Sequence, residues 1–323
     1  MQASDVKPVA YSLRNGVQES WHNGAVVCLE RNGSISFSVG SPNAIVFPRS
    51  STKPFLATAM VAAGLKLPAN LLALVCASHD GRPEHLQAAR EILSLAGLDE
   101  TALCNTKDFP LDDDAAREIM QSGGDKTALQ MNCSGKHSGM LATCVACGWD
   151  HDSSYLNQDH KLQKLITAMM PELIGEEVAD IVVDGCGAPA HAMTLVGLAR
   201  GFRSVAMAKA GSPARVVGDA MQGHPQMVGG PTRDVTLLMS GISGLIAKDG
   251  AEGVYAAALP DGRAIALKIA DGANRARPPL MRAALVAMGV DISHVDPRAF
   301  ESPIFGHGQI VGEVRVVDNL LSS

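Results

Sequence analysis

Residues 253–269 read Gly253-Val254-Tyr255-Ala256-Ala257-Ala258-Leu259-Pro260-Asp261-Gly262-Arg263-Ala264-Ile265-Ala266-Leu267-Lys268-Ile269. Two β-prone, largely apolar runs stand on either side of a tetrapeptide in which proline, aspartate and glycine favour a tight turn. This pattern predicts an antiparallel hairpin near the carboxyl end of the chain.

A second hairpin is predicted near the amino end. Asn32-Gly33 separates the β-prone runs Ala25–Leu29 and Ile35–Val39, and a further run lies at Val9–Leu13. Asn-Gly between such runs is the strongest short hairpin signal. The hairpins at the two ends of the chain could therefore share one antiparallel sheet.

Helical periodicity dominates the sequence between the hairpins. Pro83–Leu95 repeats apolar residues at the spacing of one helix face and stops before Gly97. Similar patterns predict helices at Ser138–Cys147, Leu156–Met169, Ala190–Leu198, Asp234–Met239 and Pro279–Met288. The expected fold class is α/β (α+β): residues 1–50 and 245–323 form a sheet-containing domain flanked by helices, and residues 51–244 form an inserted, mainly helical region that carries most of the site segments.

Composition narrows the classes of function. The 323-residue chain is 46% apolar, carries a net charge of −6 and has no basic run, which argues against nucleic acid and anionic membrane as partners. Met1–Ser20 has no apolar signal region, and no run reaches the roughly 18 apolar residues of a membrane helix. Seven cysteines, an odd number, do not form a secreted disulfide pattern, so we expect reduced thiols and a cytoplasmic protein.

Ser50 and Lys53 form the first candidate for chemistry. Pro48 and Pro54 flank them, and proline suits the first turn of a helix, so a helix is expected to begin near Ser50. Residues three apart share a helix face, which would bring the lysine amine to the serine hydroxyl as a base. Taken alone, the simpler interpretation is a helix-capping serine and a solvated lysine.

Three further polar segments stand out. Ser78 lies in a turn of Cys76-Ala77-Ser78-His79-Asp80, where it is either a second reactive hydroxyl or a turn residue capping the next helix. Asn132-Cys133-Ser134-Gly135-Lys136-His137 precedes a helix, and Asp184-Gly185-Cys186-Gly187 follows an apolar run. Cys133 and Cys186 could bind zinc with Asp184, Lys136 or His137, although by spacing alone two buried, unligated thiols are the simpler interpretation.

The segments in this order resemble the Rhizobium etli-type (class 3) L-asparaginases, also called the asparaginase II family. The most specific parts are Arg49-Ser50-x-x-Lys53-Pro54, Cys76-Ala77-Ser78-His79, Asn132-Cys133-Ser134-Gly135-Lys136-His137 and Asp184-Gly185-Cys186-Gly187. The resemblance covers nearly the whole chain. It implies a fold similar to serine β-lactamases and glutaminases, and hydrolysis of L-asparagine to L-aspartate and ammonia.

The resemblance also implies roles for single residues. The catalytic groups would be two serine-lysine dyads, Ser50 with Lys53 and Ser78 with Lys248. The substrate-binding residues would be Arg49, His79, Asn132, His137 and Asp184. One Zn²⁺ per chain, modulating activity without being strictly required, would be held by Cys133, Lys136 and Cys186. For Lys248, a plain surface turn is the alternative interpretation.

Other functions are compatible with the same residues. A glutaminase or another serine-lysine amidohydrolase would use the same groups. A β-lactam-hydrolysing enzyme would normally carry an export signal and a Ser-Asp-Asn or Lys-Thr-Gly tripeptide, and the sequence has neither. A zinc-dependent amino-acid-binding protein without turnover is a rival of another class. A homodimer is the default assembly for an enzyme of this size.

Overall fold

One antiparallel sheet joins the two ends of the chain in the computed structural model, which describes residues 1–321. Its eight strands follow the order β10-β11-β1-β2-β9-β8-β7, with β3 paired to β2. The strands span Lys7–Arg14 (β1), Val17–Leu29 (β2), Ile35–Val39 (β3), Ile246–Gly250 (β7), Val254–Ala258 (β8), Ala264–Ile269 (β9), Pro303–Gly306 (β10) and Gln309–Val316 (β11). The predicted sheet from both chain ends is thus confirmed.

The register places the two predicted hairpins next to each other. Val26 of β2 lies opposite Leu267 of β9, so the amino-terminal and carboxyl-terminal halves pair at the centre of the sheet. All residues of β7 and β8 are buried, which means that both faces of the sheet are covered there. Helices α7 (Leu195–Ala206) and α11 (Arg277–Ala287) pack against it.

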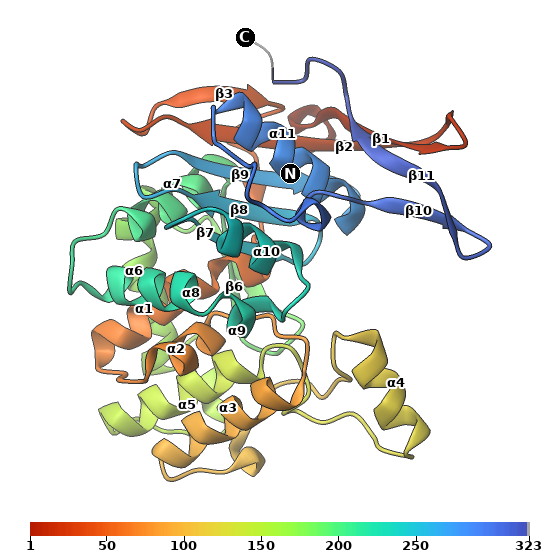
Figure 1. The fold of residues 1–323 in the computed structure, drawn as a ribbon. Coiled ribbons are helices and arrows are strands. Elements are labelled where there is room, and N and C mark those ends of the chain that lie inside the picture. The colour runs from red at the N-terminus through yellow and green to blue at the C-terminus, as the bar shows by residue number, and fades with distance from the viewer. Residues whose placement is uncertain (322–323) are drawn as a thin grey trace.

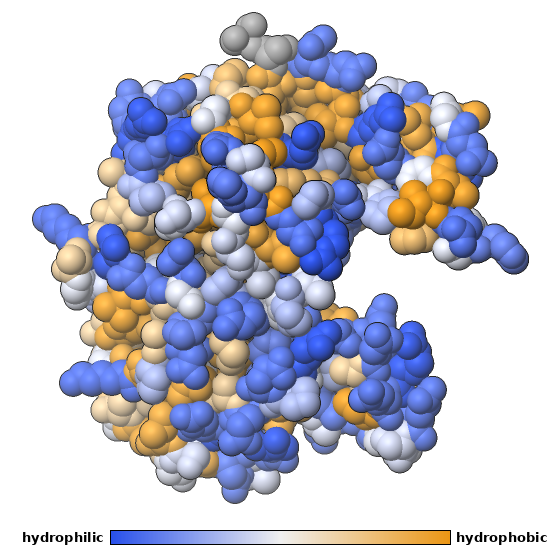
Figure 2. All heavy atoms as spheres, in the orientation of Figure 1, coloured by the Kyte–Doolittle hydropathy of each residue, from blue (hydrophilic) through white to orange (hydrophobic). Residues whose placement is uncertain are grey.

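The inserted region is a group of packed helices below the sheet in the view of Figure 1. Its helices are α1 (Lys53–Ala63), α2 (Ala69–Val75), α3 (Pro83–Leu95), α4 (Asp113–Gln121), α5 (Ser134–Cys147), α6 (Lys161–Ile174), α8 (Pro213–Gly223), α9 (Pro225–Gly229) and α10 (Asp234–Gly241). The predicted helix at Pro83–Leu95 matches α3 in both bounds. Helix α4 projects from the body, and a wide notch separates it from the β10–β11 hairpin (Figures 1 and 2).

The predicted helix at Ala190–Leu198 is wrong over its first half. Pro189–Thr194 forms β6, the middle strand of a small sheet between β4 (Ile45–Val46) and β5 (Asp180–Val183). Pairing on both edges outweighs the helix preference of its alanines. The helix begins only at Leu195, where the Thr194 hydroxyl caps it by accepting from the Gly197 amide at 2.9 Å.

Candidate active site

Lys53 is buried at the start of α1, with only 2% of its surface exposed. Its Nζ donates to the Ala77 carbonyl and, at 3.1 Å, to Ser78 Oγ. The long side chain therefore points into the protein, away from the surface position that the simpler interpretation gave it. The serine that Lys53 contacts is Ser78, twenty-five residues along the chain.

Ser50 lies in the 3₁₀ turn Arg49–Thr52 that leads into α1. With Lys53 it lines a narrow cavity of about 10 Å³, enough for about one water molecule. The remaining lining residues are Arg49, Thr52, Leu56, Lys136, Asp184, Pro189 and Ala190. Within residues 1–321 the Ser50 hydroxyl makes no hydrogen bond, so the predicted contact with Lys53 is not formed. Ser50 and Lys53 nevertheless line the same cavity, whereas Ser78 contacts Lys53 but does not line it.

Arg49 and Asp184 close one side of this cavity as an ion pair. Arg49 Nε donates to Asp184 Oδ1 at 2.5 Å, and the Gly185 amide donates to the same oxygen at 2.7 Å. The backbone of Arg49 has φ 53°, a left-handed conformation that costs a non-glycine residue on the order of 1–3 kcal/mol and is found most often at functional sites. Arg49 also lines an outer pocket of about 340 Å³, so it stands between that pocket and the cavity.

Close helix packing brings the Asn132–His137 segment to the same place. A Cβ on Gly135 would lie 2.5 Å from the Leu74 carbonyl oxygen, so only glycine allows α5 to approach α2 this closely. Lys136 and His137, in the first turn of α5, are consequently buried. This packing explains why two basic residues stand at a helix start without solvent.

Cys133, Cys186 and Lys136 form a buried cluster of two sulfurs and an amine. Lys136 Nζ donates to Cys186 Sγ at 3.0 Å. A hydrogen bond from Cys133, together with Lys136, holds the pKa of the Cys186 thiol well below its usual value despite burial. Burial by itself would lower the pKa of Lys136, but the neighbouring Cys186 and Cys133 raise it above its usual value. The Lys136 ammonium beside it thus favours the thiolate form of Cys186.

His137 stands beside the cluster with one ring nitrogen available. Its Nδ1 pairs with the Tyr155 hydroxyl at 2.8 Å, and within residues 1–321 its buried Nε2 has no well-formed hydrogen bond. Burial and the charge of Lys136 lower the pKa of His137 to about 4. The ring is thus neutral at physiological pH, and Nε2 faces the cluster as a weak donor or acceptor.

The cluster fits a zinc ion when Lys136 is counted among the ligands. Zn²⁺ prefers thiolate and nitrogen donors, and two sulfurs with one amine supply three of them. Within residues 1–321 no three His, Cys, Asp or Glu side chains form a metal-binding group, so the amine is needed as the third ligand. Lys136 would have to release its proton on binding, and the metal would replace the ammonium charge beside Cys186.

His79 and Asn132, two of the predicted substrate-binding residues, hold the segments together. His79 Nε2 pairs with Ser134 Oγ at 2.8 Å, and its Nδ1 accepts from the Gly81 amide at 3.1 Å, so both ring nitrogens are occupied. The Asn132 side chain accepts from Cys133 Sγ at 3.0 Å. Neither residue lines the narrow cavity, and their contact with substrate stays a prediction.

Lys248 is fully buried on β7, so the surface-turn interpretation is wrong. Its Nζ donates to Asp249 Oδ1 at 2.5 Å and to the Asp249 carbonyl at 2.8 Å. Burial, and to a smaller degree the charge of Lys53, lowers the pKa of Lys248 to about 8. Its backbone carbonyl accepts from Ser51 Oγ at 3.1 Å, which ties β7 to the turn that carries Ser50. The amine that hydrogen-bonds Ser78 Oγ is that of Lys53 and not that of Lys248.

The sequence from residue 10 to residue 316 matches the family described as L-asparaginase II. The chain belongs to the L-asparaginase II family. This bears out the resemblance at the level of the family and supports a hydrolase that acts on amides. Assignment to the Rhizobium etli-type subclass stays a prediction. No curated protein sequence matches the chain.

Solved structures similar to this L-asparaginase II family member share little sequence with it. A β-lactamase from Mycobacterium bovis is 14% identical, with 82% of this chain and 94% of that chain covered and a TM-score of 0.44. A Bacillus subtilis protein described as a probable glutaminase, complexed with 6-diazo-5-oxo-L-norleucine, is 13% identical, with 83% and 85% covered and a TM-score of 0.38.

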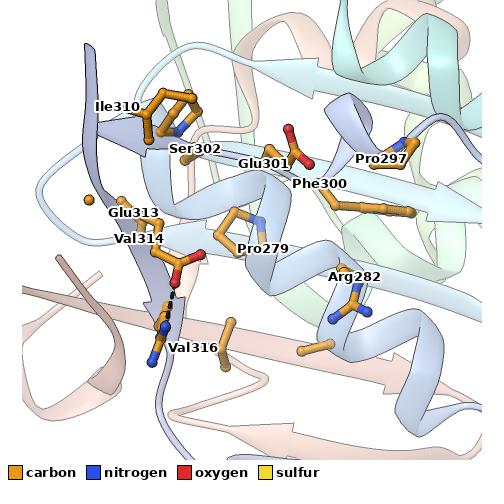
Figure 3. Close-up of a pocket in the computed structure, with 14 residues that line it drawn as sticks. Pro279, Arg282, Pro297, Phe300, Glu301, Ser302, Ile310, Glu313, Val314 and Val316 are labelled. Atoms are coloured by element: carbon orange, nitrogen blue, oxygen red, sulfur yellow. Dashed lines mark hydrogen bonds and ion pairs between the residues drawn. The ribbon is translucent and has the colours of Figure 1, made fainter. Parts of the chain in front are cut away.

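A larger groove of the family member, about 700 Å³, lies elsewhere on the molecule. It runs between α11, which contributes Pro279 and Arg282, and β11, which contributes Val314 and Val316 (Figure 3). None of the predicted site residues lines it. Within the described part of the chain, no helix combines the length and apolar character needed to cross a membrane.

Sequence reasoning missed the carboxylate that holds Lys248 and the residues around it. Asp249 accepts from Lys248 and is also bound by Arg233 and Arg277. Tyr155, the partner of His137, was missed as well. These partners come from distant elements, and the sole local signal was the adjacency of Lys248 and Asp249.

Proposed function

We propose that this protein hydrolyses the side-chain amide of L-asparagine to L-aspartate and ammonia, with Ser50 as the nucleophile and Lys53 as its base. The observation that carries the proposal is the narrow cavity in which Ser50 and Lys53 share a wall with the Arg49–Asp184 ion pair. The hydroxyl, the amine and the two opposite charges match an amide borne by a zwitterionic amino acid. Because the cavity holds only about one water molecule, the substrate would enter from the outer pocket that Arg49 also lines, with the Arg49–Asp184 pair opening. Membership of the L-asparaginase II family supports the same reaction class.

Arg49 and Asp184 provide the complement of an α-amino acid. The guanidinium suits the α-carboxylate, and the carboxylate suits the α-ammonium group. Each of the two neutralises the other in the ligand-free arrangement. A bound zwitterion would supply an opposite charge to each, so the pair can separate without leaving a buried charge unpaired.

The proposed reaction has two chemical stages. Ser50 Oγ attacks the amide carbon while Lys53 removes the hydroxyl proton, and the backbone amides at the start of α1 stabilise the oxyanion. The C–N bond breaks as ammonia takes up a proton, delivered by Lys53 directly or through Ser78, to which Lys53 is hydrogen-bonded. Water, deprotonated by the same amine, then attacks the ester on Ser50, and L-aspartate leaves.

Ammonia release from purified protein tests this function. We expect turnover of L-asparagine in a coupled ammonia assay, with L-glutamine measured in parallel because a glutaminase would use the same groups. Calorimetric binding of L-asparagine without release of ammonia or L-aspartate would instead support a binding protein. D-asparagine serves as the control, since its α-substituents cannot meet both charges of the Arg49–Asp184 pair in the same pose.

We further propose that Cys133, Lys136 and Cys186 hold one Zn²⁺ next to the substrate. Bound there, zinc would supply positive charge that orients the substrate, while Lys53 remains the base for Ser50. The cavity wall contains Lys136, which links the metal position to the substrate position.

Replacing Cys186 by serine is expected to weaken zinc binding at least about 10-fold and to raise KM, with little change in Tm. Zinc content after dialysis, measured by atomic emission, is the readout. Cys147→Ser is the matched control, because Cys147 lies in the same helix α5 as Lys136 and its side chain, within residues 1–321, bonds only the Ala63 carbonyl. Unchanged zinc content in Cys186→Ser contradicts the ligand assignment. Complete loss of turnover on chelation, restored by zinc, contradicts the modulatory role.

The pH dependence of turnover should report Lys248. Its pKa of about 8 means that the neutral amine gains population as pH rises through that value. Because the Lys248 amine lies close enough to Lys53 for their charges to interact, we propose that its neutral form takes up protons from Lys53, so kcat/KM rises with pH and levels off above about 8. We expect Lys248→Met to remove this limb and to lower kcat by about 10²–10⁴-fold, the range for a general acid or base. A profile that is flat between pH 6 and 9 in the wild type would contradict this role.

A further inference from the structure

A buried charge cluster lies between the Ser78 segment and strand β7. It pairs three cations with three carboxylates: Lys248, Arg233 and Arg277 with Asp249, Asp80 and Asp234. The carboxylate side chains are 5–11% exposed. Charges this deeply buried are stable only when every one is paired, so the arrangement of each member depends on the others.

Arg233 is the member of the cluster that contacts both the Ser78 segment and strand β7. Its Nη2 binds Asp249 Oδ2, and its Nη1 lies 3.7 Å from Asp80 Oδ1. Asp249 uses its other oxygen, Oδ1, to hold Lys248 Nζ. Asp80 is two residues beyond Ser78 in the same turn. One guanidinium therefore connects the segment of Ser78 to the strand of Lys248.

The chain leading to Arg233 is fitted against the Ser78 turn. The Ser78 amide donates to the Val228 carbonyl at 3.0 Å. A Cβ on Gly230 would lie 1.9 Å from Asp80 Oδ2, and Gly230 has φ +110°. Only glycine allows the backbone to pass this close to the carboxylate. The backbone path thus brings the segment that precedes Arg233 against the Asp80 carboxylate.

We propose that Arg233 is a positioning residue that holds Ser78 and Lys248 in register by binding Asp80 and Asp249 at the same time. The proposal rests on the proposed function, because it assigns Arg233 a part in the same amide hydrolysis. Arg277 also binds Asp249, at 3.2 Å, but its second carboxylate partner is Asp234 in α10 and not Asp80. Arg233 alone among these arginines bridges the two segments.

The charge of Arg233 also acts on Lys248. The groups that face the Lys248 amine are Asp249 on its own strand, Lys53 from α1, Cys76 at the end of α2, and Arg233 before α10. Asp249 raises the pKa of Lys248, whereas Arg233 and Lys53 lower it. Removing Arg233 takes away a repelling cation and leaves Asp249 less neutralised. Both changes raise the pKa of Lys248.

Arg233→Met is the primary test, measured by the kinetics and by NMR titration of lysine labelled with ¹³C at the ε carbon. We expect kcat to fall about 10²-fold, as for a misplaced catalytic group, with KM nearly unchanged. The titration of Lys248, assigned with Lys248→Met, should move to higher pH, together with the acidic limb of kcat/KM. Arg277→Met should leave kcat closer to the wild type, because the bridge to Asp80 remains. Arg215→Met, at the exposed pair with Asp219, is the control for the change of residue type.

Arg233→Lys is a second, milder variant that keeps the proposal testable if Arg233→Met does not fold. Lysine keeps the positive charge but lacks the fork that reaches two carboxylates. We expect reduced kcat while Lys248 titrates near its wild-type pH. The proposal is overturned if Arg233→Lys has wild-type kcat, or if Arg233→Met leaves both kcat and the Lys248 titration unchanged. A wild-type protein that releases no ammonia would contradict the proposed function. The NMR titration needs no turnover, so it would still test the effect of Arg233 on Lys248.

Discussion

Ser50→Ala is expected to abolish ammonia release from L-asparagine while the protein keeps its fold. Loss of the nucleophile of a covalent mechanism lowers kcat by about 10⁴-fold or more. The Ser50 hydroxyl makes no hydrogen bond within residues 1–321, so its removal breaks none and Tm should stay near the wild-type value. Steady-state ammonia assays and differential scanning calorimetry measure the two effects.

Two serine variants make the Ser50→Ala result specific. Ser153→Ala changes an exposed serine in another 3₁₀ turn, Ser153–Leu156, and should behave as the wild type. Ser78→Ala removes the hydroxyl bound to Lys53 and should leave a measurable residual rate, since Ser78 lies outside the cavity wall. If Ser50→Ala retains most of its activity and Ser78→Ala retains none, the nucleophile is Ser78.

Lys53→Met should be as inactive as Ser50→Ala, but with a loss of stability. The methionine side chain fills the space of the lysine stem, whereas the Ala77 carbonyl and Ser78 Oγ lose their shared donor. Leaving buried polar groups unsatisfied costs about 1–3 kcal/mol each, which should appear as a lower Tm. Chemical denaturation followed by circular dichroism measures the change in free energy of unfolding.

Lys53→Arg separates loss of the base from loss of the charge. A guanidinium keeps the positive charge but cannot be deprotonated in a protein, so this variant should also be inactive. Lys164→Met removes an exposed lysine paired with Asp159 and should leave activity unchanged. An active Lys53→Arg variant would show that Lys53 acts through its charge and not as a base.

The sheet was predictable because its strands are local patterns. The runs around Pro260-Asp261-Gly262-Arg263 and Asn32-Gly33 carry period and turn signals that need no distant information, and they became β8–β9 and β2–β3. The strand β6 was not predictable in the same way. Its alanine-rich sequence favours a helix, and only pairing with β4 and β5, from distant parts of the chain, makes it a strand.

The same contrast between local signals and distant contacts applies to the site residues. The motif order predicted that Ser50, Lys53, Lys136 and Asp184 belong to one site. All four line the narrow cavity. The hydrogen bond of Lys53 to Ser78 was not predicted, because the three-residue spacing suggested Ser50, whereas the buried side chain reaches Ser78 from another element. The role of Lys53 as the base for Ser50 stays a proposal. Arg233 gave no sequence signal, because its role depends on contacts with two carboxylates far away in the chain. Zinc binding and the homodimer stay predictions.

Covalent labelling tests the central claim, that Ser50 is the nucleophile of an L-asparagine amidohydrolase. The wild-type protein is incubated with a diazo-ketone analogue of L-asparagine, digested, and mapped by peptide mass spectrometry. The proposed mechanism predicts one adduct per chain, on Ser50, whose formation is prevented by L-aspartate and absent in Lys53→Met. An adduct on Ser78, or none on any serine while the protein turns over L-asparagine, would contradict it.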